Sequence, residues 1–498
     1  MIPVHRLHIH IRTLISAGYK VGVVRQTETR ALKAISSNAS KPFTRDLSAV
    51  YTAGTWVDDL TLNGDAAPLG VADSTGSSSD LASHTLVTIV EKGDGGPQGG
   101  LSERVTIGIV AVQVSTGQIV YDQFEDAGMR SELETRLAHA NPIEILVPPK
   151  GKISKLTMKI LQHTAGRGTS DGRPIRIERV SEESVSSYNQ ALDLVDETVN
   201  AGASVDEASK AATMETLGKL PHYALLAFAT CMAHLRSFGL SALFQRSLNF
   251  SSFAARSTML LTANTLSSLE IFRNSTDGRG HGSLLWLVDR CQTPMGKRLL
   301  RKWLAQPLSE MFPLKVRSDA VQEVFEKQSS SASLHKALGL LQGTPDLEKG
   351  LARLSYNRSS PSEMATILLA LNRITTEFNF ESRDKVPLTS SMLKDAIFAL
   401  SDARQVAFEA LSSISTHAAK EDDKANLFVD SERFPKVQDV KDLLSINKQD
   451  FTDHLKELRK ELKRPSLQYA KVADKEYLIE VRKEDAKKVP SNWLRISE

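Results

Sequence analysis

The strongest candidates for chemistry are basic residues near the C-terminal end of the sequence. Residues 431–498 hold sixteen Lys/Arg and thirteen Asp/Glu, a higher density of charge than the rest of the chain has. Basic side chains spread over a hairpin suit contacts with backbone phosphates, which depend on salt and carry no sequence information. Seven residues are the candidates for such contacts: Lys463, Arg464, Lys471, Lys475, Lys483, Lys487 and Lys488.

The same segment has a second interpretation. Glu476, Glu480, Glu484 and Asp485 lie between the basic residues, as on a solvated charged face. Three aromatic residues also belong to the segment: Tyr469, Tyr477 and Trp493. The residues alone therefore leave open whether this segment binds nucleic acid or forms an ordinary charged surface.

No nucleotide-binding loop is present in the sequence. Gly278–Gly282 lacks the Gly-x-x-x-x-Gly-Lys-Ser/Thr spacing, and Arg298 follows Gly296 and Lys297 where a hydroxyl residue is required. Cys291 stands where that motif needs its first glycine. Since the loop amides, the lysine and the hydroxyl act together, we expect no nucleotide site and no P-loop ATPase activity within this chain.

Catalytic and metal sites are also not predicted. Two-metal phosphoryl chemistry needs carboxylates on adjacent strands, but the central strand Val105–Val114 offers only Gln113, and Asp122 and Glu125 come near the end of the next strand. His5, His8 and His10 do not share one helix face with a carboxylate, so we interpret them as surface or partner-facing residues. Two cysteines, Cys231 and Cys291, favour a reducing compartment.

The elements that would position the basic residues form an arm. Pro465 ends an amphipathic helix, and Leu467–Val472 and Lys475–Val481 form a hairpin around Ala473 and Asp474. The helix is predicted from apolar residues that step by 3, 4 or 7: Val437, Val440, Leu444, Phe451, Leu455, Leu458 and Leu462. The pattern predicts a long helix that carries a small charged hairpin.

Upstream, the elements change in kind along the chain. An amphipathic helix over 3–16, stopped by Gly18, precedes a strand at Tyr19–Val24. The Gly/Ser-rich residues 61–100, with Gly93–Gly100 among them, are predicted to be flexible apart from a strand at Leu86–Val90. An α/β region follows, with strands at 105–114, 119–124 and 143–148 and a helix at 129–138. After residue 188 the spacing is helical over roughly 240 residues.

The length and net charge of the chain restrict its possible architecture and partners only weakly. With 498 residues, the chain has room for about three or four domains. A net charge of +3 neither requires nor excludes a polyanionic partner. Residues Tyr223–Leu235 form the longest apolar run, which is too short to cross a bilayer, and the N-terminal residues lack a signal-peptide core. We therefore expect a soluble intracellular protein without a membrane partner.

Several segments together resemble the MutS family of DNA mismatch-repair proteins. Gly18–Thr29 resembles a strand and turn of the family's mismatch-binding domain, and Gly282–Leu308 closely resembles the core of its lever domain. Pro345–Leu354 resembles the element that follows, and residues 463–497 resemble the clamp. Thr27–Lys33 and Phe43–Thr52 are most similar to the eukaryotic MutS homologue 3 branch, of a fungal kind.

The resemblance implies a multidomain protein that combines α/β and all-α regions. Its expected parts are a partial mismatch-binding domain (1–62), a flexible stretch with one connector strand (63–104), an RNase-H-like connector (84–190), a helical lever or core domain (191–430) and a clamp arm with a small β tip (431–498). Family members continue into an ATPase that uses ATP and Mg²⁺. We therefore expect this chain to be a fragment or a truncated gene model.

The resemblance also implies partners. That branch pairs with MutS homologue 2 and binds double-stranded DNA with mismatches or insertion–deletion loops in the nucleus. The competing hypothesis is a helical interaction or scaffold protein without DNA binding, because the amphipathic face of 437–462 suits a partner helix equally well. Binding of a labelled duplex at low salt distinguishes the two hypotheses.

Overall fold

The structure is a computed structural model. It describes residues 6–26, 42–56, 85–95, 102–169, 172–180, 187–200, 207–244, 249–253, 258–327, 332–429, 434–462, 464–472, 475–481 and 493. The chain divides into two compact units. One contains Met1–Gly22 and Ala49–Leu411, and the other contains Val23–Ser48 and Ser412–Glu498. The larger unit holds the principal sheet and most of the helices.

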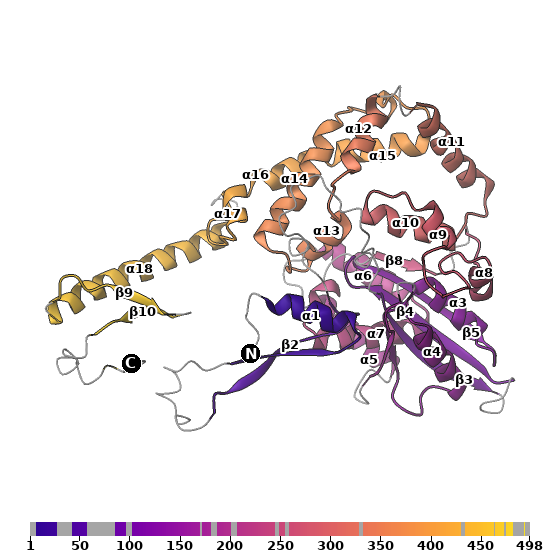
Figure 1. The fold of residues 1–498 in the computed structure, drawn as a ribbon, viewed down its shortest axis with the longest axis horizontal. Coiled ribbons are helices and arrows are strands. Elements are labelled where there is room, and N and C mark those ends of the chain that lie inside the picture. Colours follow the sequence, from indigo (N-terminus) through magenta and orange to yellow (C-terminus); the bar gives the residue numbers. More distant parts are fainter. Residues whose placement is uncertain are drawn as a thin grey trace. The chain divides into compact units, whose positions relative to one another are not determined.

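A six-stranded mixed sheet organises the larger unit (Figure 1). Its strands are β3 (Thr85–Gly95), β4 (Arg104–Gln113), β5 (Gln118–Asp126), β6 (Glu144–Val147), β7 (Arg176–Arg179) and β8 (Asn249–Ser252), in the spatial order β7-β6-β3-β4-β5-β8. Strands β3, β4 and β5 are antiparallel, whereas β6, β7 and β8 each run parallel to a neighbour. The mixed α/β prediction is confirmed.

One sequence prediction within this sheet is wrong. Gly93–Gly100 is predicted to be a flexible loop, yet β3 continues through Gly95, while residues 96–100 lie outside the described residues. Gly93 pairs with Val105 and, after a register shift, Gly95 pairs with Arg104. The strand extends past its apolar run because β4 supplies backbone partners along its whole length, and backbone pairing does not require an apolar side chain.

Helices cover both faces of the sheet. On one face Ile107 and Ile109 share a core with Leu133 of α3 (Ser131–Ala140) and Leu161 of α4 (Lys155–Arg167). On the other face Val110 packs with α5 (Tyr188–Asn200) and α7 (His222–Ser237). Alternate residues of β4 therefore enter two separate cores, as expected for a sheet covered on both sides.

The packing of α7 brings a helix very close to the sheet. A Cβ added at Gly108 would lie 2.2 Å from the carbonyl carbon of Tyr223, so β4 needs a glycine at this point. Helix α7 and strand β8, and helix α5 from residue 191 onward, belong to the region predicted as helical lever, yet they pack on or join the α/β sheet. The boundary predicted near residue 190 therefore does not coincide with a break in packing.

The first described elements are α1 (Leu7–Ser16), β1 (Val21–Gln26) and β2 (Arg45–Tyr51). Helix α1 and strand β1 agree with the predicted helix and strand, and Gly18 has the left-handed conformation (φ +85°) that ends the helix. After β2, the Thr52 hydroxyl donates to Glu144 at 2.6 Å and the Gly54 amide donates at 3.1 Å. Burial raises the pKa of the Glu144 carboxyl, which lies on β6.

The rest of the larger unit is mainly helical, as predicted. Its helices are α6 (Glu207–Gly218), α8 (Ala263–Ser268), α9 (Leu284–Val288), α10 (Pro294–Ala305), α11 (Met311–Lys327), α12 (Ala332–Leu341), α13 (Leu347–Ser355), α14 (Pro361–Glu377), α15 (Ser391–Asp402) and α16 (Arg404–Ser412). Proline at the first turn and a capping hydroxyl start α10 and α14, with Thr293 and Ser360 as caps. Among the described helices, none combines the length and apolarity that a bilayer span requires.

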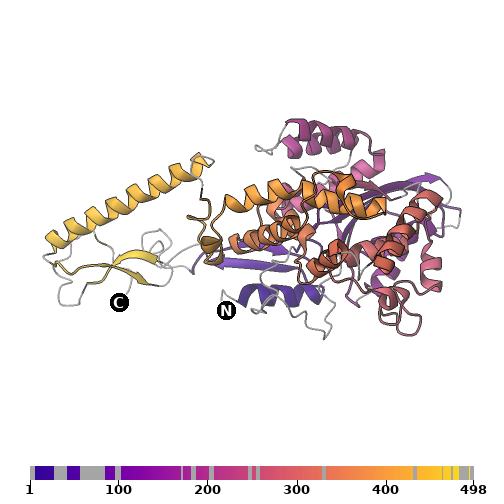
Figure 2. The same ribbon diagram turned by 90° about the horizontal axis from the view of Figure 1, so that it is seen from above.

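The smaller unit contains the predicted arm. Helix α17 (Thr416–Lys420) precedes α18 (Pro435–Glu461), a single helix of 27 residues. It ends at Glu461, with Leu462 as its C-cap, before Pro465 as predicted. The two strands that follow lie beside the C-terminal half of α18 in both views (Figures 1 and 2).

Candidate nucleic-acid interface

The hairpin predicted after α18 is present. Strand β9 (Tyr469–Val472) pairs antiparallel with β10 (Lys475–Ile479), with Lys475 opposite Val472 and Leu478 opposite Ala470. The register shifts between Lys475 and Leu478, where Tyr477 has a φ of +60°. A bulge at this point redirects the side chain of Tyr477.

Tyr477 joins an aromatic cluster that holds the hairpin against α18. Its ring stacks on Phe451 with centroids 4.1 Å apart and meets the edge of Tyr469 at 5.4 Å. The Tyr469 hydroxyl lies 2.8 Å from Nδ1 of His454. Because Phe451 and His454 are three residues apart on α18, one helix face receives both strands.

Hydrogen bonds shape the turn that leads from the helix into the hairpin. The Arg464 amide donates to the carbonyl of Arg459 at 3.0 Å, and the Leu467 amide donates to the carbonyl of Arg464 at 3.2 Å. The Arg459 guanidinium donates from Nε to the Leu467 carbonyl at 2.8 Å. Leu458 and Leu467 are buried beneath this turn. The chain direction after α18 is thus set by several local contacts.

The structure places three of the seven predicted phosphate-contact residues. Arg464 lies in the turn between α18 and β9 and is half-buried. The backbone of Lys471 lies in β9 and that of Lys475 in β10, on either side of the hairpin turn. The other four candidates lie outside the described residues: Lys463, Lys483, Lys487 and Lys488. Their role therefore stays a prediction.

One basic residue near the hairpin was missed by the sequence reasoning. Lys460 is exposed on the last turn of α18, and among the described residues its ammonium group has no acidic partner. By contrast, Lys456 on the same helix pairs with Asp453 at 2.6 Å. Proximity to Lys463 and Arg464 along the sequence is the available signal, since Arg459 and Lys460 shortly precede this basic segment.

No catalytic or metal arrangement forms among the described residues. Asp122 pairs with Arg136 at 2.8 Å, and Gln113 accepts a hydrogen bond from the Thr116 hydroxyl at 2.9 Å. Within the described part of the chain, no three potential ligands from His, Cys, Asp and Glu come together. Burial raises the pKa of the Cys231 thiol to about 12, which makes it a poor nucleophile.

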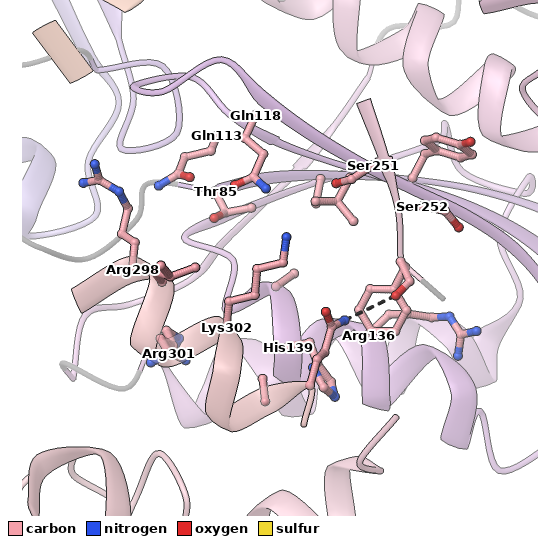
Figure 3. A pocket seen from close by; sticks show the side chains of 18 of the residues that line it. Thr85, Gln113, Gln118, Arg136, His139, Ser251, Ser252, Arg298, Arg301 and Lys302 are labelled. Atoms are coloured by element: carbon pink, nitrogen blue, oxygen red, sulfur yellow. Dashed lines mark hydrogen bonds between the residues drawn. The ribbon is translucent and has the colours of Figure 1, made fainter. Parts of the chain in front are cut away.

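A cavity lies elsewhere, in the larger unit between the sheet and α10 (Figure 3). Its volume is about 430 Å³. Strands β4, β5 and β8 supply one wall, α3 supplies Arg136 and His139, and α10 supplies Arg298, Arg301 and Lys302. This cavity could not be predicted from the sequence, because β4 and α10 on its opposite sides are almost two hundred residues apart.

Comparison with known proteins defines the class of this chain. The family models for MutS domain I, MutS domain II and MutS domain III match residues 1–60, 86–221 and 264–479, in that order. The chain belongs to the MutS family. Within that family it is MSH3-like, as the curated relatives show.

Three fungal relatives match this chain along its whole length. It is 43% identical to the "DNA mismatch repair protein MSH3" of Mycosarcoma maydis, over 100% of this chain and 44% of the relative. It is 38% identical to the protein of that name from Cryptococcus neoformans, over 100% and 45%. The "DNA mismatch repair protein msh-3" of Neurospora crassa is 38% identical, over 100% and 42%. The chain thus spans less than half the length of these relatives.

Proposed function

We propose that this chain acts in DNA mismatch repair by holding duplex DNA with the hairpin at the end of α18. One observation carries the proposal: the match to MutS domain III runs to residue 479, so it includes α18 and both hairpin strands. The DNA would carry mismatches or insertion–deletion loops. A heterodimer with MutS homologue 2 in the nucleus would be the working form.

The parts of the chain would divide this work as the resemblance implies. Residues 1–62 would belong to a mismatch-binding domain, 84–190 to an RNase-H-like connector, 191–430 to a lever and 431–498 to the clamp. Three antiparallel strands followed by parallel ones in the principal sheet support the connector assignment. A long helix that ends in a hairpin supports the clamp assignment.

The physical basis of binding would be charge. Residues 463–498 contain nine Lys/Arg and six Asp/Glu, so the tip carries a net positive charge, whereas α18 holds equal numbers of each sign. Lysine contacts to phosphate release condensed counterions, which makes affinity fall as salt rises. Such contacts do not read bases, so this tip would hold DNA of any sequence.

The test is duplex binding at several salt concentrations, measured by fluorescence anisotropy with the triple variant Lys471→Ala, Lys483→Ala and Lys487→Ala. Three lost contacts should flatten the log–log salt slope by about 2.7, since each contact contributes about 0.9. A matched control removes three charges from α18 instead: Lys436→Ala, Lys441→Ala and Lys448→Ala. An equal slope in wild type and tip variant contradicts DNA binding by the hairpin. A chain that does not bind the duplex even at low salt supports the scaffold hypothesis.

A further inference from the structure

The cavity between the sheet and α10 has a volume within the range of small-molecule sites, about 300–1,000 Å³. It is remote in sequence from the hairpin, and no part of the proposed DNA-binding function uses it. We propose that it binds a small organic anion with a flat apolar body and a single carboxylate, sulfonate or phosphate group.

The apolar body would rest on the walls of the cavity. Ile109, Ala111 and Val120 contribute from the sheet, and Leu299 and Ala305 contribute from α10. Leu299 is 49% exposed, so a ligand could cover it. Covering such surface with a ligand stabilises the complex by roughly 25 cal/mol per Å² of apolar area removed from water.

The negative group would meet Lys302. This side chain rises from α10 toward the sheet in Figure 3, and among the described residues its ammonium group has no acidic partner. Other cations around the cavity are engaged. Arg298 pairs with Asp346 at 2.7 Å and with Glu348 at 2.6 Å, and Arg136 pairs with Asp122 at 2.8 Å.

Among the described residues, the carboxylate and most of the cations around the cavity already have partners. Glu348 is the one carboxylate among the residues that line it, and it shares the Arg298 guanidinium with Asp346. Arg301 lies over the ring of Phe272 at 4.0 Å. A ligand anion beside Lys302 would pair with an exposed ammonium group, so the contact should be modest in strength and should weaken as salt rises.

Polar groups on the opposite wall would orient the ligand. The Gln113 side chain accepts from Thr116 through its carbonyl, which leaves its amide NH₂ to donate. Gln118 and Ser251 line the same wall (Figure 3).

The test uses the whole chain and two flat ligands that differ in charge, naphthoate and naphthamide, titrated by calorimetry. Wild type should bind naphthoate more tightly than naphthamide. The Lys302→Met variant should bind naphthoate about 3- to 5-fold more weakly and naphthamide almost unchanged. The Lys302→Arg variant should restore most of the affinity for naphthoate. Lys315→Met, which removes an exposed charge from α11, serves as the matched control and should behave as wild type.

A second variant tests the location of the site. Leu299→Trp on α10 fills part of the cavity from a half-exposed position, so it should weaken both ligands without unfolding the chain. Equal melting temperatures for wild type and variants would show that folding is intact. The proposal fails if wild type binds neither ligand at millimolar concentration, if Lys302→Met binds naphthoate as wild type does, or if Leu299→Trp changes neither affinity.

Discussion

The principal sheet and helix α18 differ in how deeply their apolar residues are buried. Both were predicted from the spacing of apolar residues. In β4, every residue from Ile107 to Gln113 is buried, whereas on α18 Val440, Leu443 and Ile446 are each more than half exposed. The spacing of apolar residues therefore predicts whether a segment is a helix or a strand. How deeply its side chains are buried depends on which other elements pack against that segment.

Because of this difference in burial, the sheet and the arm contribute unequally to the stability of the chain. Each fully buried aliphatic side chain of the sheet contributes roughly 1.5–3 kcal/mol relative to an exposed one. The exposed residues of α18 contribute little of this, so its hairpin end depends on the aromatic cluster and on local hydrogen bonds. We expect substitutions in the sheet to affect stability far more than substitutions at matched positions in the arm.

The largest effect is expected at Gly108. A methyl group there would collide with the backbone of Tyr223 on α7, and backbone cannot rotate away as a side chain can. We expect Gly108→Ala to lower the free energy of unfolding by about 3 kcal/mol or more. Gly93→Ala in β3 is the control, because a methyl group there meets nothing within 4 Å. Equal denaturation midpoints for the two variants would show that α7 does not press on β4.

The second effect concerns pH. Burial lowers the pKa of His234 on α7 to about 4, against 6.5 for an exposed histidine. The unfolded chain therefore takes up a proton more readily, so stability present above pH 6.5 is lost as pH falls toward 4. Full protonation costs on the order of 1–3 kcal/mol. Melting curves between these values should show a smaller acid loss for His234→Phe, and an identical loss would contradict the assignment.

The third effect tests the arm itself. Phe451→Ala removes the ring on which Tyr477 stacks, so β10 should lose its contact with α18. We expect a local loss of about 1–2 kcal/mol, visible as faster amide exchange in Leu478 and Ile479 while the sheet is unaffected.

The matched control for that test is Leu443→Ala, at a position 59% exposed on the same helix. Alanine favours a helix at least as well as leucine, so the change should stay within about 0.5 kcal/mol. A large destabilisation by Leu443→Ala would show that the apolar face of α18 is covered in solution, and the contrast between sheet and arm would then disappear.

Much of the secondary structure was predictable because the signals were local. Gly18 and Pro465 mark helix ends, and the alternation in 105–114 marks a strand. Strand β8 was missed because Asn249–Ser252 is short and polar, and it becomes a strand only by pairing with β5. The glycines at the end of β3 were misread for the same reason, since their strand character comes from a partner.

For the hairpin, the sequence predicted the turn and both strands. It could not predict that Tyr477 would lie at a bulge and stack on Phe451, because that contact joins a strand to a helix 26 residues away. Which lysines reach phosphate also depends on side-chain placement, and only Arg464 among the candidates has a described side chain.

The amino-acid sequence by itself indicated the family, most of the secondary structure and a long helix followed by a basic hairpin, because periodicity, glycine and proline act over a few residues. Only the tertiary structure decided that α7 lies against Gly108 and that β8 is an edge strand of the sheet. It also decided that Lys302, which has no acidic partner among the described residues, faces a cavity. These features arise from contacts between segments far apart in the chain, and local pattern holds no information on such distances.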